Sequence, residues 1–381
     1  MEDFQSSSGS SYYAEAKRPM LRKPSVVLLG PQRAAVSGVS THLNQLLGSQ
    51  LATAAELCHF QVGSEGRTES TAARLLRFAL SPLALGVFLL VRRPRIVHLN
   101  TSLEPKAYWR DIAYLLVARL LGRKVVYQVH GGALPQDFFR GQPWRTRKLR
   151  WVLSLPDVVV LLASVEMTAY REFVPGARLR VIPNAIEVTG LIDRPAERSA
   201  AGPLHLAYLG RLVDSKGIFE IVAALKILRE RGIDCRLSVA GAGPDAERMR
   251  ALVDAAGLSD RVAFRGALAG AAKDELWRSA DIFVFPTWHR EGLPYALLES
   301  MAAGAVPVVA PAGAIPDVVQ NDVHGVFVPP KDPAALADAV ASLHGDRARL
   351  ARLAAAARAR VVEHYTVGRL AHDFQDLYES L

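Results

Sequence analysis

The stretch that decides the fold is FVFPTWHREGLPYALLESMAAGAVPVVA, at residues 283–310. It begins with a short apolar run, passes through a polar loop, takes up the periodicity of a helix over 294–303 and ends in a second apolar run over 306–310. Two short apolar runs joined by a helical segment are typical of a βαβ unit, whose strands are parallel. This stretch therefore predicts an α/β fold.

The same alternation continues towards both ends of the chain. Helical segments separate the apolar runs, so the sequence predicts parallel sheets with helices on both faces. The runs before Ala185 are SVVLLG (25–30), RIVHLN (95–100), KVVYQVH (124–130), DVVVLLAS (157–164) and LRVIPN (179–184). Those after Pro203 are LHLAYLG (204–210), CRLSVAG (235–241), RVAFRG (261–266), DIFVFPT (281–287), VPVVA (306–310) and GVFVP (325–329).

Between Ala185 and Pro203 the periodicity stops, and we place the interdomain connection there. Two successive parallel-sheet units put a cleft between them, with the carboxyl ends of their strands facing it. The predicted parts are a disordered tail (1–23), a first Rossmann-like domain (24–185) and a second one (186–365).

The composition is that of a globular protein with an anionic partner. The 381 residues, half of them hydrophobic, suit two domains of about 150–200 residues each. The formal net charge is +9, which suits nucleic acid, an acidic lipid surface or a phosphorylated substrate. Cys58 and Cys235 fit no metal-ligand spacing, and so few cysteines indicate a reducing compartment.

A turn with the features of a phosphate site lies at GRLVDSKG, residues 210–217. Gly210 ends an apolar run and allows a close approach of the backbone to a ligand. Arg211 offers a planar fork to phosphate oxygens, and Lys216 adds a point charge. The turn is compatible with a diphosphate site, but an ordinary strand-to-helix turn has the same features.

Two carboxylates eight residues apart follow in EGLPYALLE, residues 291–299. Pro294 suits the first position of a helix, so we expect Glu291 in the loop and Glu299 about one and a half turns inside the helix. Carboxylates repel phosphate, and we therefore expect them to bind the hydroxyl groups of a sugar or a ribose. The alternative is a solvated helix face, which leaves unexplained why Glu299 stands within an apolar run.

The free N–H groups of Gly292 and Leu293 would face the cleft, at a helix N-terminus that favours anions. A separate segment, GAGPDAE (241–247), formally fits a dinucleotide fingerprint. The next apolar run ends in Arg265 and Gly266 instead of the acid that such a site needs. This disfavours a dinucleotide site.

Taken in order, GRLVDSKG, AGAGPDAERM, VAFRGAL and the opening stretch resemble the retaining GT-B glycosyltransferases of family 4. The resemblance covers 204–330 and extends more loosely to the turn near Gly38, the His-Gly-Gly at 130–132 and the IPNA join at 182–185. It implies two Rossmann-like domains that face each other across a cleft. It also implies that the C-terminal segment, 366–381, crosses back onto the first domain.

For the second domain the resemblance implies a set of donor contacts. Arg211 and Lys216 would neutralise the donor diphosphate, Glu299 would bind the ribose hydroxyls, and Glu291 would bind a hydroxyl of the transferred sugar. The turn at Arg265 and Gly266 would flank the base. The predicted donor-binding residues are Gly38, Gly210, Arg211, Lys216, Arg265, Gly266, Glu291, Gly292, Leu293 and Glu299.

For the first domain the resemblance implies a donor-sugar contact at His130, which ends a strand before two glycines. Gly38 lies in a turn that would approach the diphosphate. In this class a donor phosphate oxygen is thought to accept the acceptor proton, so His130 would orient the sugar and need not be a general base. The predicted catalytic residues are His130, Glu291, Arg211 and Lys216.

Two segments of the first domain point to a membrane surface. Residues 75–91 are apolar but fall short of the roughly 20 residues of a spanning helix, so we expect a buried or membrane-resting helix. Residues 138–151 hold five basic and four aromatic side chains and no acid. They predict either a basic helix with its aromatic side chains packed inward or a patch for anionic headgroups or a phosphate-linked acceptor.

The sequence therefore predicts a retaining, hexosyltransferase-type glycosyltransferase that moves a sugar from a nucleotide-diphosphate sugar to a glycan or lipid-linked glycan. We expect it to act in bacterial surface polysaccharide or glycolipid synthesis, in the cytoplasm at the inner membrane face. No cofactor, metal ion or nucleic acid is expected. Two rivals remain, namely an epimerase or phosphorylase on the same fold and a non-catalytic nucleotide-sugar-binding protein.

Overall fold

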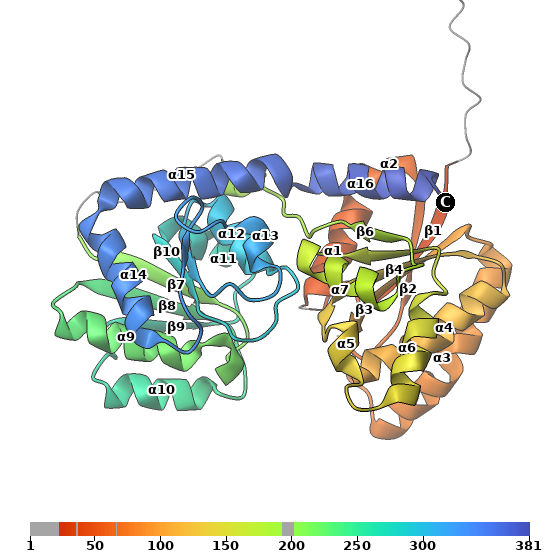
Figure 1. The fold of residues 1–381 in the computed structure, drawn as a ribbon, viewed down its shortest axis with the longest axis horizontal. Helices are drawn as coiled ribbons and strands as arrows, with labels where there is room; N and C mark the ends of the chain where they lie inside the picture. The colour runs from red at the N-terminus through yellow and green to blue at the C-terminus, as the bar shows by residue number, and fades with distance from the viewer. Residues whose placement is uncertain (1–22, 36, 66, 193–201) are drawn as a thin grey trace, which may run out of the picture.

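The computed structural model describes residues 23–35, 37–65, 67–192 and 202–381. Most of the predicted tail and most of the predicted connection lie outside these ranges. The described chain forms two lobes, each built on a parallel sheet (Figure 1). The predicted α/β class and the pairing of two Rossmann-like domains are confirmed.

The first sheet has six parallel strands among the described residues, in the order β2-β1-β3-β4-β5-β6. Its strands are β1 (Ser25–Gly30), β2 (Glu56–Gln61), β3 (Ile96–Leu103), β4 (Lys124–Gly132), β5 (Val158–Leu161) and β6 (Leu179–Val181). The helices between them are α1 (Gly38–Gly48), α2 (Leu51–Ala54), α3 (Thr71–Arg92), α4 (Pro105–Leu120), α5 (Pro135–Phe138), α6 (Pro143–Leu153) and α7 (Ser164–Phe173).

The second sheet also has six parallel strands among the described residues, in the order β12-β11-β10-β7-β8-β9. Its strands are β7 (Leu204–Leu209), β8 (Cys235–Ala240), β9 (Val262–Gly266), β10 (Ile282–Phe285), β11 (Val306–Val309) and β12 (Val326–Phe327). Its helices are α8 (Thr189–Ile192), the short 3₁₀ helix η1 (Asp214–Lys216), α9 (Ile218–Glu230), α10 (Ala246–Ala255), α11 (Gly270–Ser279), α12 (Tyr295–Ala302), α13 (Ile315–Val318), α14 (Pro333–Gly345) and α15 (Arg347–His364).

The last helix, α16 (Val367–Glu379), lies on the first domain, in line with α15 on the second (Figure 1). Its buried residues Leu370, Phe374 and Tyr378 share a core with Leu28 and Leu43 of β1 and α1. Helices α3, α4, α6 and α7 pack against the opposite face of the same sheet. Because the chain's last helix closes the first core, the first domain is built from both ends of the described chain.

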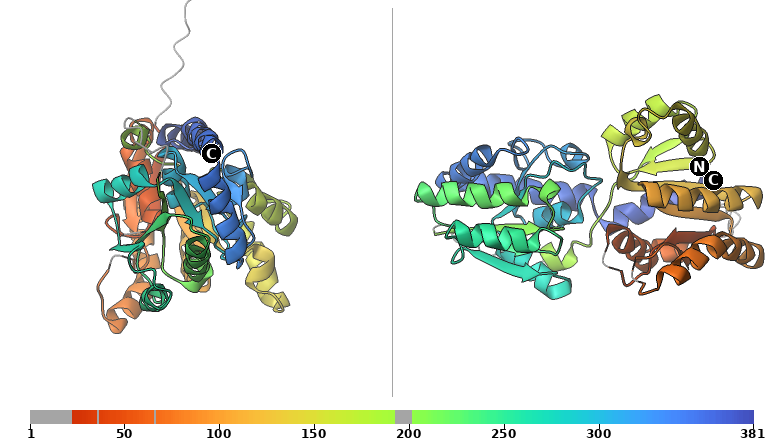
Figure 2. Two further views of the ribbon diagram at one scale, coloured as in Figure 1. Left: turned by 90° about the vertical axis from the view of Figure 1, so that its left-hand side faces the viewer. Right: turned by 90° about the horizontal axis from the view of Figure 1, so that it is seen from below.

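The chain passes between the domains twice, and the two passages lie side by side (Figure 2). A parallel bridge joins Ile186 to Thr366, with N–H groups of Ile186 and Val367 donating to Tyr365 and Ile186 carbonyls. Ala185 belongs to the core of the first domain and Ile186 to that of the second. The first passage therefore lies at the beginning of the predicted connection.

Each sheet has one point at which its strand order reverses. In the first sheet this point lies between β1 and β3, and in the second it lies between β7 and β10. Open parallel sheets bind ligands in the crevice beyond the strand ends at such a point. The fold thus provides two crevices, one on each domain.

The apolar segment 75–91 lies within α3; of its two predicted alternatives the buried helix is wrong, and the membrane-resting helix stays a prediction. Only Leu85 and Leu89 are buried, whereas Leu83 is 68% and Val87 63% exposed. Among the described residues, α3 is the one helix with the length and hydropathy to span a membrane. It packs along α4 and contributes only Leu85 and Leu89 to the fully buried core, which leaves an apolar stripe on the surface.

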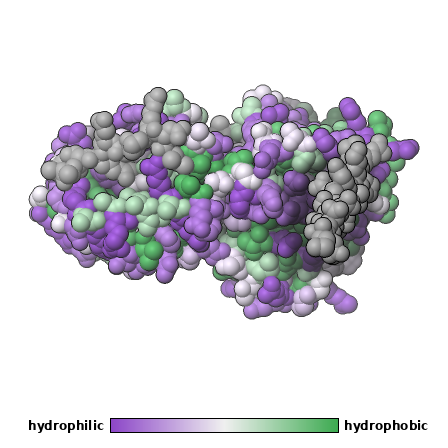
Figure 3. Space-filling view, turned by 90° about the horizontal axis from the view of Figure 1, so that it is seen from above, coloured by the Kyte–Doolittle hydropathy of each residue, from purple (hydrophilic) through white to green (hydrophobic). Residues whose placement is uncertain are grey.

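The basic-aromatic segment 138–151 does not bury all of its rings, so the alternative with inward aromatic side chains holds only in part. Phe139 is buried, but Trp144 is 62% and Trp151 49% exposed. Lys148 stacks on the ring of Trp109, 4.9 Å from its centroid, and so joins α6 to α4. By contrast, the side of the molecule that carries α15 and α16 is mainly hydrophilic (Figure 3).

Candidate active site

An ion pair stands at the crevice of the second domain. Lys216, at the end of η1, places its Nζ 2.5 Å from Oε1 of Glu291, and the hydroxyl of Thr287 donates to the same oxygen at 2.9 Å. The two charged side chains are only 14% and 10% exposed. The structure thus brings together Lys216 and Glu291, for which the sequence predicts separate ligand groups, the diphosphate and the sugar.

Tight backbone packing fixes this pair. Gly217 has a φ of 75°, and a Cβ there would lie 2.4 Å from the carbonyl oxygen of Pro286. Gly313 has a φ of 60°, and a Cβ there would lie 2.0 Å from the carbonyl oxygen of Glu291. Both positions therefore require glycine. The loops that carry Lys216 and Glu291 are held at one separation.

Glu299 is buried in α12, and the alternative of a solvated helix face is wrong. Its carboxylate accepts from Lys273 at 2.5 Å and from the indole N–H of Trp277 at 3.2 Å. Lys273 and Trp277 stand four residues apart on α11 and so share one helix face. Sequence reasoning missed both, although a Lys and a Trp at this spacing were the available signal. These two partners on α11 explain how the Glu299 carboxylate can be buried within an apolar run of the sequence.

Three glycines meet at the carboxyl ends of β7, β8 and β9. The Gly241 N–H donates to the Gly266 carbonyl at 2.7 Å, and a Cβ on Gly241 would lie 1.9 Å from the carbonyl oxygen of Gly210. Arg211, next to them, is exposed and has no ion pair among the described residues. The side chain of Arg265 instead lines a groove with Arg236 and Ser238, whose lining does not include Arg211. The structure therefore brings Gly210 and Gly266 together at Gly241, with Arg211 next to Gly210 in sequence, while Arg265 lines a separate groove.

His130 lies in β4 beside Asn100 of β3. The Asn100 amide donates through Nδ2 to the Leu29 carbonyl at 3.1 Å, so its Oδ1 accepts from Nε2 of His130 at 2.9 Å. Because Nε2 then carries the hydrogen, Nδ1 is left as an acceptor. Burial, with His42 and His98 nearby, lowers the pKa of His130 well below its usual value. A neutral ring with a free acceptor suits contact with a sugar hydroxyl.

Two further histidines back His130. The ring of His42 meets that of His130 edge-on at 4.8 Å between centroids, and His98 lies between Tyr378 and Gln128. Burial lowers the pKa of both His42 and His98 to about 3. The C-terminal helix therefore reaches the predicted sugar contact through a chain of neutral rings, which sequence reasoning did not identify.

The predicted residues of the two domains meet across the cleft. A Cβ on Gly292 would lie 2.7 Å from the His130 carbonyl oxygen, and one on Gly38 would lie 3.6 Å from the ring of Tyr295. The side-chain amide of Asn184 donates to the Leu293 carbonyl at 2.8 Å. The loop before α12 thus lies against the first domain. Glu291 is therefore the neighbour in sequence of a residue, Gly292, that contacts the His130 backbone.

Comparison with protein families gives two matches that together span most of the chain. Residues 192–360 match the family described as glycosyl transferases group 1, and residues 56–189 match glycosyltransferase family 4. A GDP-mannose-dependent alpha-(1-6)-phosphatidylinositol monomannoside mannosyltransferase of Mycobacterium tuberculosis is 31% identical over 277 residues, which are 68% of this chain and 70% of the relative. A 2-deoxystreptamine N-acetyl-D-glucosaminyltransferase of Streptomyces fradiae is 28% identical over 317 residues, 73% of this chain and 72% of the relative.

Solved structures share the fold at low sequence identity. A sucrose-phosphate synthase from Thermosynechococcus elongatus has a TM-score of 0.74 and 19% identity, with 93% of this chain and 98% of that chain covered. Anabaena Alr3699/HepE in complex with UDP-glucose has a TM-score of 0.72 and 17% identity, with 94% and 100% covered. Both likenesses agree with the two-lobed arrangement described above.

Proposed function

Because this chain belongs to the GT-B glycosyltransferases of family 4 and group 1, we propose that it transfers a sugar from a nucleotide-diphosphate sugar to a lipid-linked acceptor with retention of configuration. The observation that carries the proposal is the Lys216–Glu291 pair at the second crevice, opposite His130. The M. tuberculosis relative uses GDP-mannose and the Anabaena structure holds UDP-glucose, which supports a nucleotide-sugar donor.

In the proposed step the bond between the anomeric carbon and the donor diphosphate breaks, and a bond from that carbon to an acceptor hydroxyl oxygen forms on the same face. The hydroxyl proton moves to the departing diphosphate. Arg211, Lys216 and the N-terminus of α12 stabilise the charge that develops there. Glu291 fixes a sugar hydroxyl, and Nδ1 of His130 accepts another. A closed cleft excludes water, which would otherwise hydrolyse the donor.

No metal ion enters this scheme, because the diphosphate charge is met by side chains and by backbone N–H groups. The expected result is full activity in excess EDTA. A loss of activity that Mg²⁺ or Mn²⁺ restores would contradict this part of the proposal.

A thermal-shift panel of UDP-, GDP- and ADP-sugars identifies the donor, since a ligand that binds the native state raises the melting temperature. The chosen donor is then incubated with and without membrane lipid extract. We expect nucleoside diphosphate to be released only with the extract. Epimerisation of the donor sugar would favour an epimerase, and release of nucleoside diphosphate that depends on added phosphate would favour a phosphorylase. Donor binding without turnover would favour a non-catalytic nucleotide-sugar-binding protein.

The location that we propose is the inner face of the cytoplasmic membrane. Its support is the apolar stripe of α3, which includes Leu76, Leu83 and Val87, together with the exposed Trp144 and Trp151 of α6. Both helices pack on one face of the first sheet. Apolar and tryptophan side chains flanked by cations suit the headgroup region of an anionic bilayer.

Vesicle sedimentation tests this location. Wild-type protein should pellet with phosphatidylcholine vesicles that contain about 30% phosphatidylglycerol, and Leu83→Ser/Val87→Ser should weaken binding about tenfold through lost apolar burial. Leu252→Ser, an exposed position on α10, is the matched control. Equal binding of both variants would remove α3 from the proposal.

A further inference from the structure

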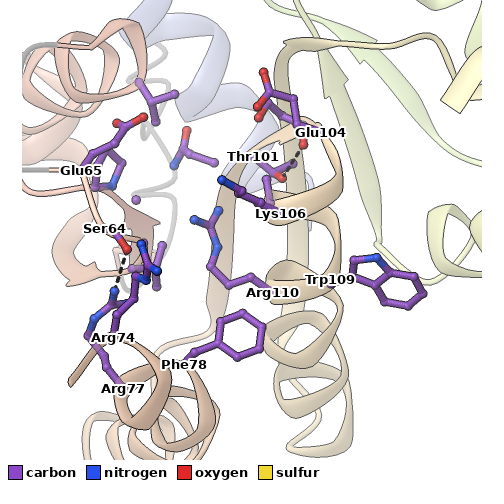
Figure 4. Close-up of a pocket in the computed structure, with 18 of the residues that line it drawn as sticks. Ser64, Glu65, Arg74, Arg77, Phe78, Thr101, Glu104, Lys106, Trp109 and Arg110 are labelled. Carbon is purple, nitrogen blue, oxygen red and sulfur yellow. Dashed lines mark hydrogen bonds between the residues drawn. The ribbon is translucent and has the colours of Figure 1, made fainter. Parts of the chain in front are cut away.

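A cavity of about 600 Å³ opens in the crevice of the first domain. It lies beyond the ends of β1, β2 and β3, between the loop at 62–65 and the first turns of α3 and α4 (Figure 4). This is the point at which the first sheet reverses its strand order. The cavity lies on the other domain from the Lys216–Glu291 pair, so it has space for a second substrate.

The two ends of the cavity differ in character. Asn100 lines it and also holds His130, so one end adjoins the predicted sugar contact. Leu75 and Phe78 of α3 line it as well, and they are 65% and 49% exposed. The cavity therefore connects the reaction centre with the apolar stripe of α3.

Three cations occupy the space between these ends. In the view of Figure 4, Arg74, Lys106 and Arg110 point into the cavity, Glu65 and Glu104 lie at one end, and Phe78 lies beyond the cations. Arg74 and Lys106 have no ion pair among the described residues. Arg77, in contrast, is paired with Glu69 and donates to Ser64.

Arg110 is fixed from behind. Its Nε and Nη2 donate to the two carboxylate oxygens of Asp111 at 2.6 and 3.0 Å, and Thr101 donates to the same carboxylate. Asp111 is 2% exposed. Nη1 has no acceptor among the described residues, and Gly63 leaves it room, since a Cβ there would lie 2.7 Å from it. The Arg110 guanidinium is therefore held in one orientation and presents the unsatisfied N–H donors of Nη1 to the cavity.

We infer that this cavity binds the phosphate of a phosphate-linked lipid acceptor. The phosphate lies on Arg110, Arg74 and Lys106, the sugar or polyol hydroxyl reaches towards His130, and the lipid leaves along Leu75 and Phe78. The order of carboxylates, cations and apolar side chains along the cavity matches the order of hydroxyls, phosphate and acyl chains in such a molecule. This inference rests on the proposed function and names its acceptor class.

Two probes test the inference by calorimetry, namely glycerophosphoglycerol, a soluble phosphodiester, and dihexanoyl-phosphatidylglycerol below its micelle concentration. The variant is Arg74→Gln/Lys106→Gln, because Arg110 supports a buried carboxylate and its removal would endanger folding. Lys226→Gln, an exposed basic position on α9 of the second domain, is the matched control.

We expect the lipid probe to bind wild-type protein at least about tenfold more tightly than the variant, and Lys226→Gln to stay within about twofold of wild type. Equal affinity of wild type and variant would overturn the phosphate site. Equal affinity of both probes for wild type would overturn the lipid part and indicate a water-soluble phosphate acceptor. If either of these results is found, the nucleotide-sugar donor is added to Arg74→Gln/Lys106→Gln. A rise in its melting temperature would show that the phosphate site has failed while the proposed function stands.

Discussion

The two crevices stand on similar sheets, but different charged side chains are paired at each of them. At the β7–β10 crevice, Glu291 and Glu299 are shielded from solvent and each already has a lysine partner, Lys216 or Lys273. At the β1–β3 crevice, Arg74 and Lys106 have no ion pair among the described residues. A paired carboxylate is held in position to bind hydroxyl groups, whereas an unpaired cation is free to take an anion.

The difference separates two tasks. A donor site must hold one molecule in one geometry at each turnover, and pre-formed pairs supply that geometry. An acceptor site that opens beside an exposed apolar helix can take its ligand from a surface. Substitutions can alter the donor crevice, the contact between the two domains or the buried histidines of the first domain one at a time.

The largest effect is expected for Glu291→Gln. The amide cannot pair with Lys216, and it binds a sugar hydroxyl more weakly than a carboxylate does. We expect kcat to fall by about a hundredfold or more while the donor still binds. Steady-state kinetics measure this, with Glu230→Gln, an exposed position on α9, as control. A variant with full kcat would remove Glu291 from the reaction.

Glu299→Gln should act on donor affinity more than on kcat. It leaves Lys273 without its carboxylate and weakens the contact predicted for the ribose, which corresponds to about 1.5–3 kcal/mol. Titration calorimetry should show donor Kd rising by about ten- to a hundredfold. Glu275→Gln on the same helix as Lys273 is the control. Unchanged Kd would place the ribose elsewhere.

Gly292→Ala changes the contact between the two halves. Its Cβ would press on the His130 carbonyl, 2.7 Å away, and hold the cleft open. We expect transfer to slow by about tenfold, since small misplacements of reacting groups are costly. Gly345→Ala, where a Cβ meets nothing within 4 Å, is the control. A donor Kd close to that of wild type would show that the substitution has changed only the contact between the two domains.

The last prediction concerns the pH dependence of stability, and no loss of activity is expected from it at neutral pH. His42 and His98 are buried and have pKa values lowered to about 3, so they bind protons only after unfolding. Their stabilising contribution is present above pH 6.5 and is lost as the pH falls from about 6.5 towards 3. Each should lower the free energy of unfolding by about 1.4 kcal/mol per pH unit there.

Denaturant unfolding of His98→Gln should therefore depend less steeply on pH than that of wild type. His372→Gln, at an exposed position on α16, is the control and should keep the wild-type slope. A slope that is unchanged in both variants would contradict the buried, neutral state of His98.

Sequence reasoning reached the donor side further than the acceptor side, for a physical reason. Gly210, Lys216 and Glu291 lie on strand-to-helix turns, where local order along the chain fixes their position, so their place at one crevice could be expected, although the Lys216–Glu291 ion pair was not. The partners of Glu299 come from another helix, and the C-terminal helix backs His130 through Phe374, whose ring contacts His42. Contacts of this kind depend on packing between elements that no local pattern records.

The cavity residues were out of reach for the same reason. Arg74 and Arg110 stand on separate helices, and only the arrangement of α3 and α4 brings them to one space. The apolar run 75–91 was visible in the sequence, but its composition fits a buried helix as well as an exposed one. Only packing against α4 decides which side of α3 remains uncovered.

One measurement tests the central claim most directly, namely a parallel count of nucleoside diphosphate released and sugar joined to lipid, with the best donor and acceptor-bearing vesicles. The account predicts equal amounts of both products, an unchanged anomeric configuration, and loss of both in Glu291→Gln. Nucleoside diphosphate released without sugar in the lipid fraction, or transfer that survives in Glu291→Gln, would contradict it.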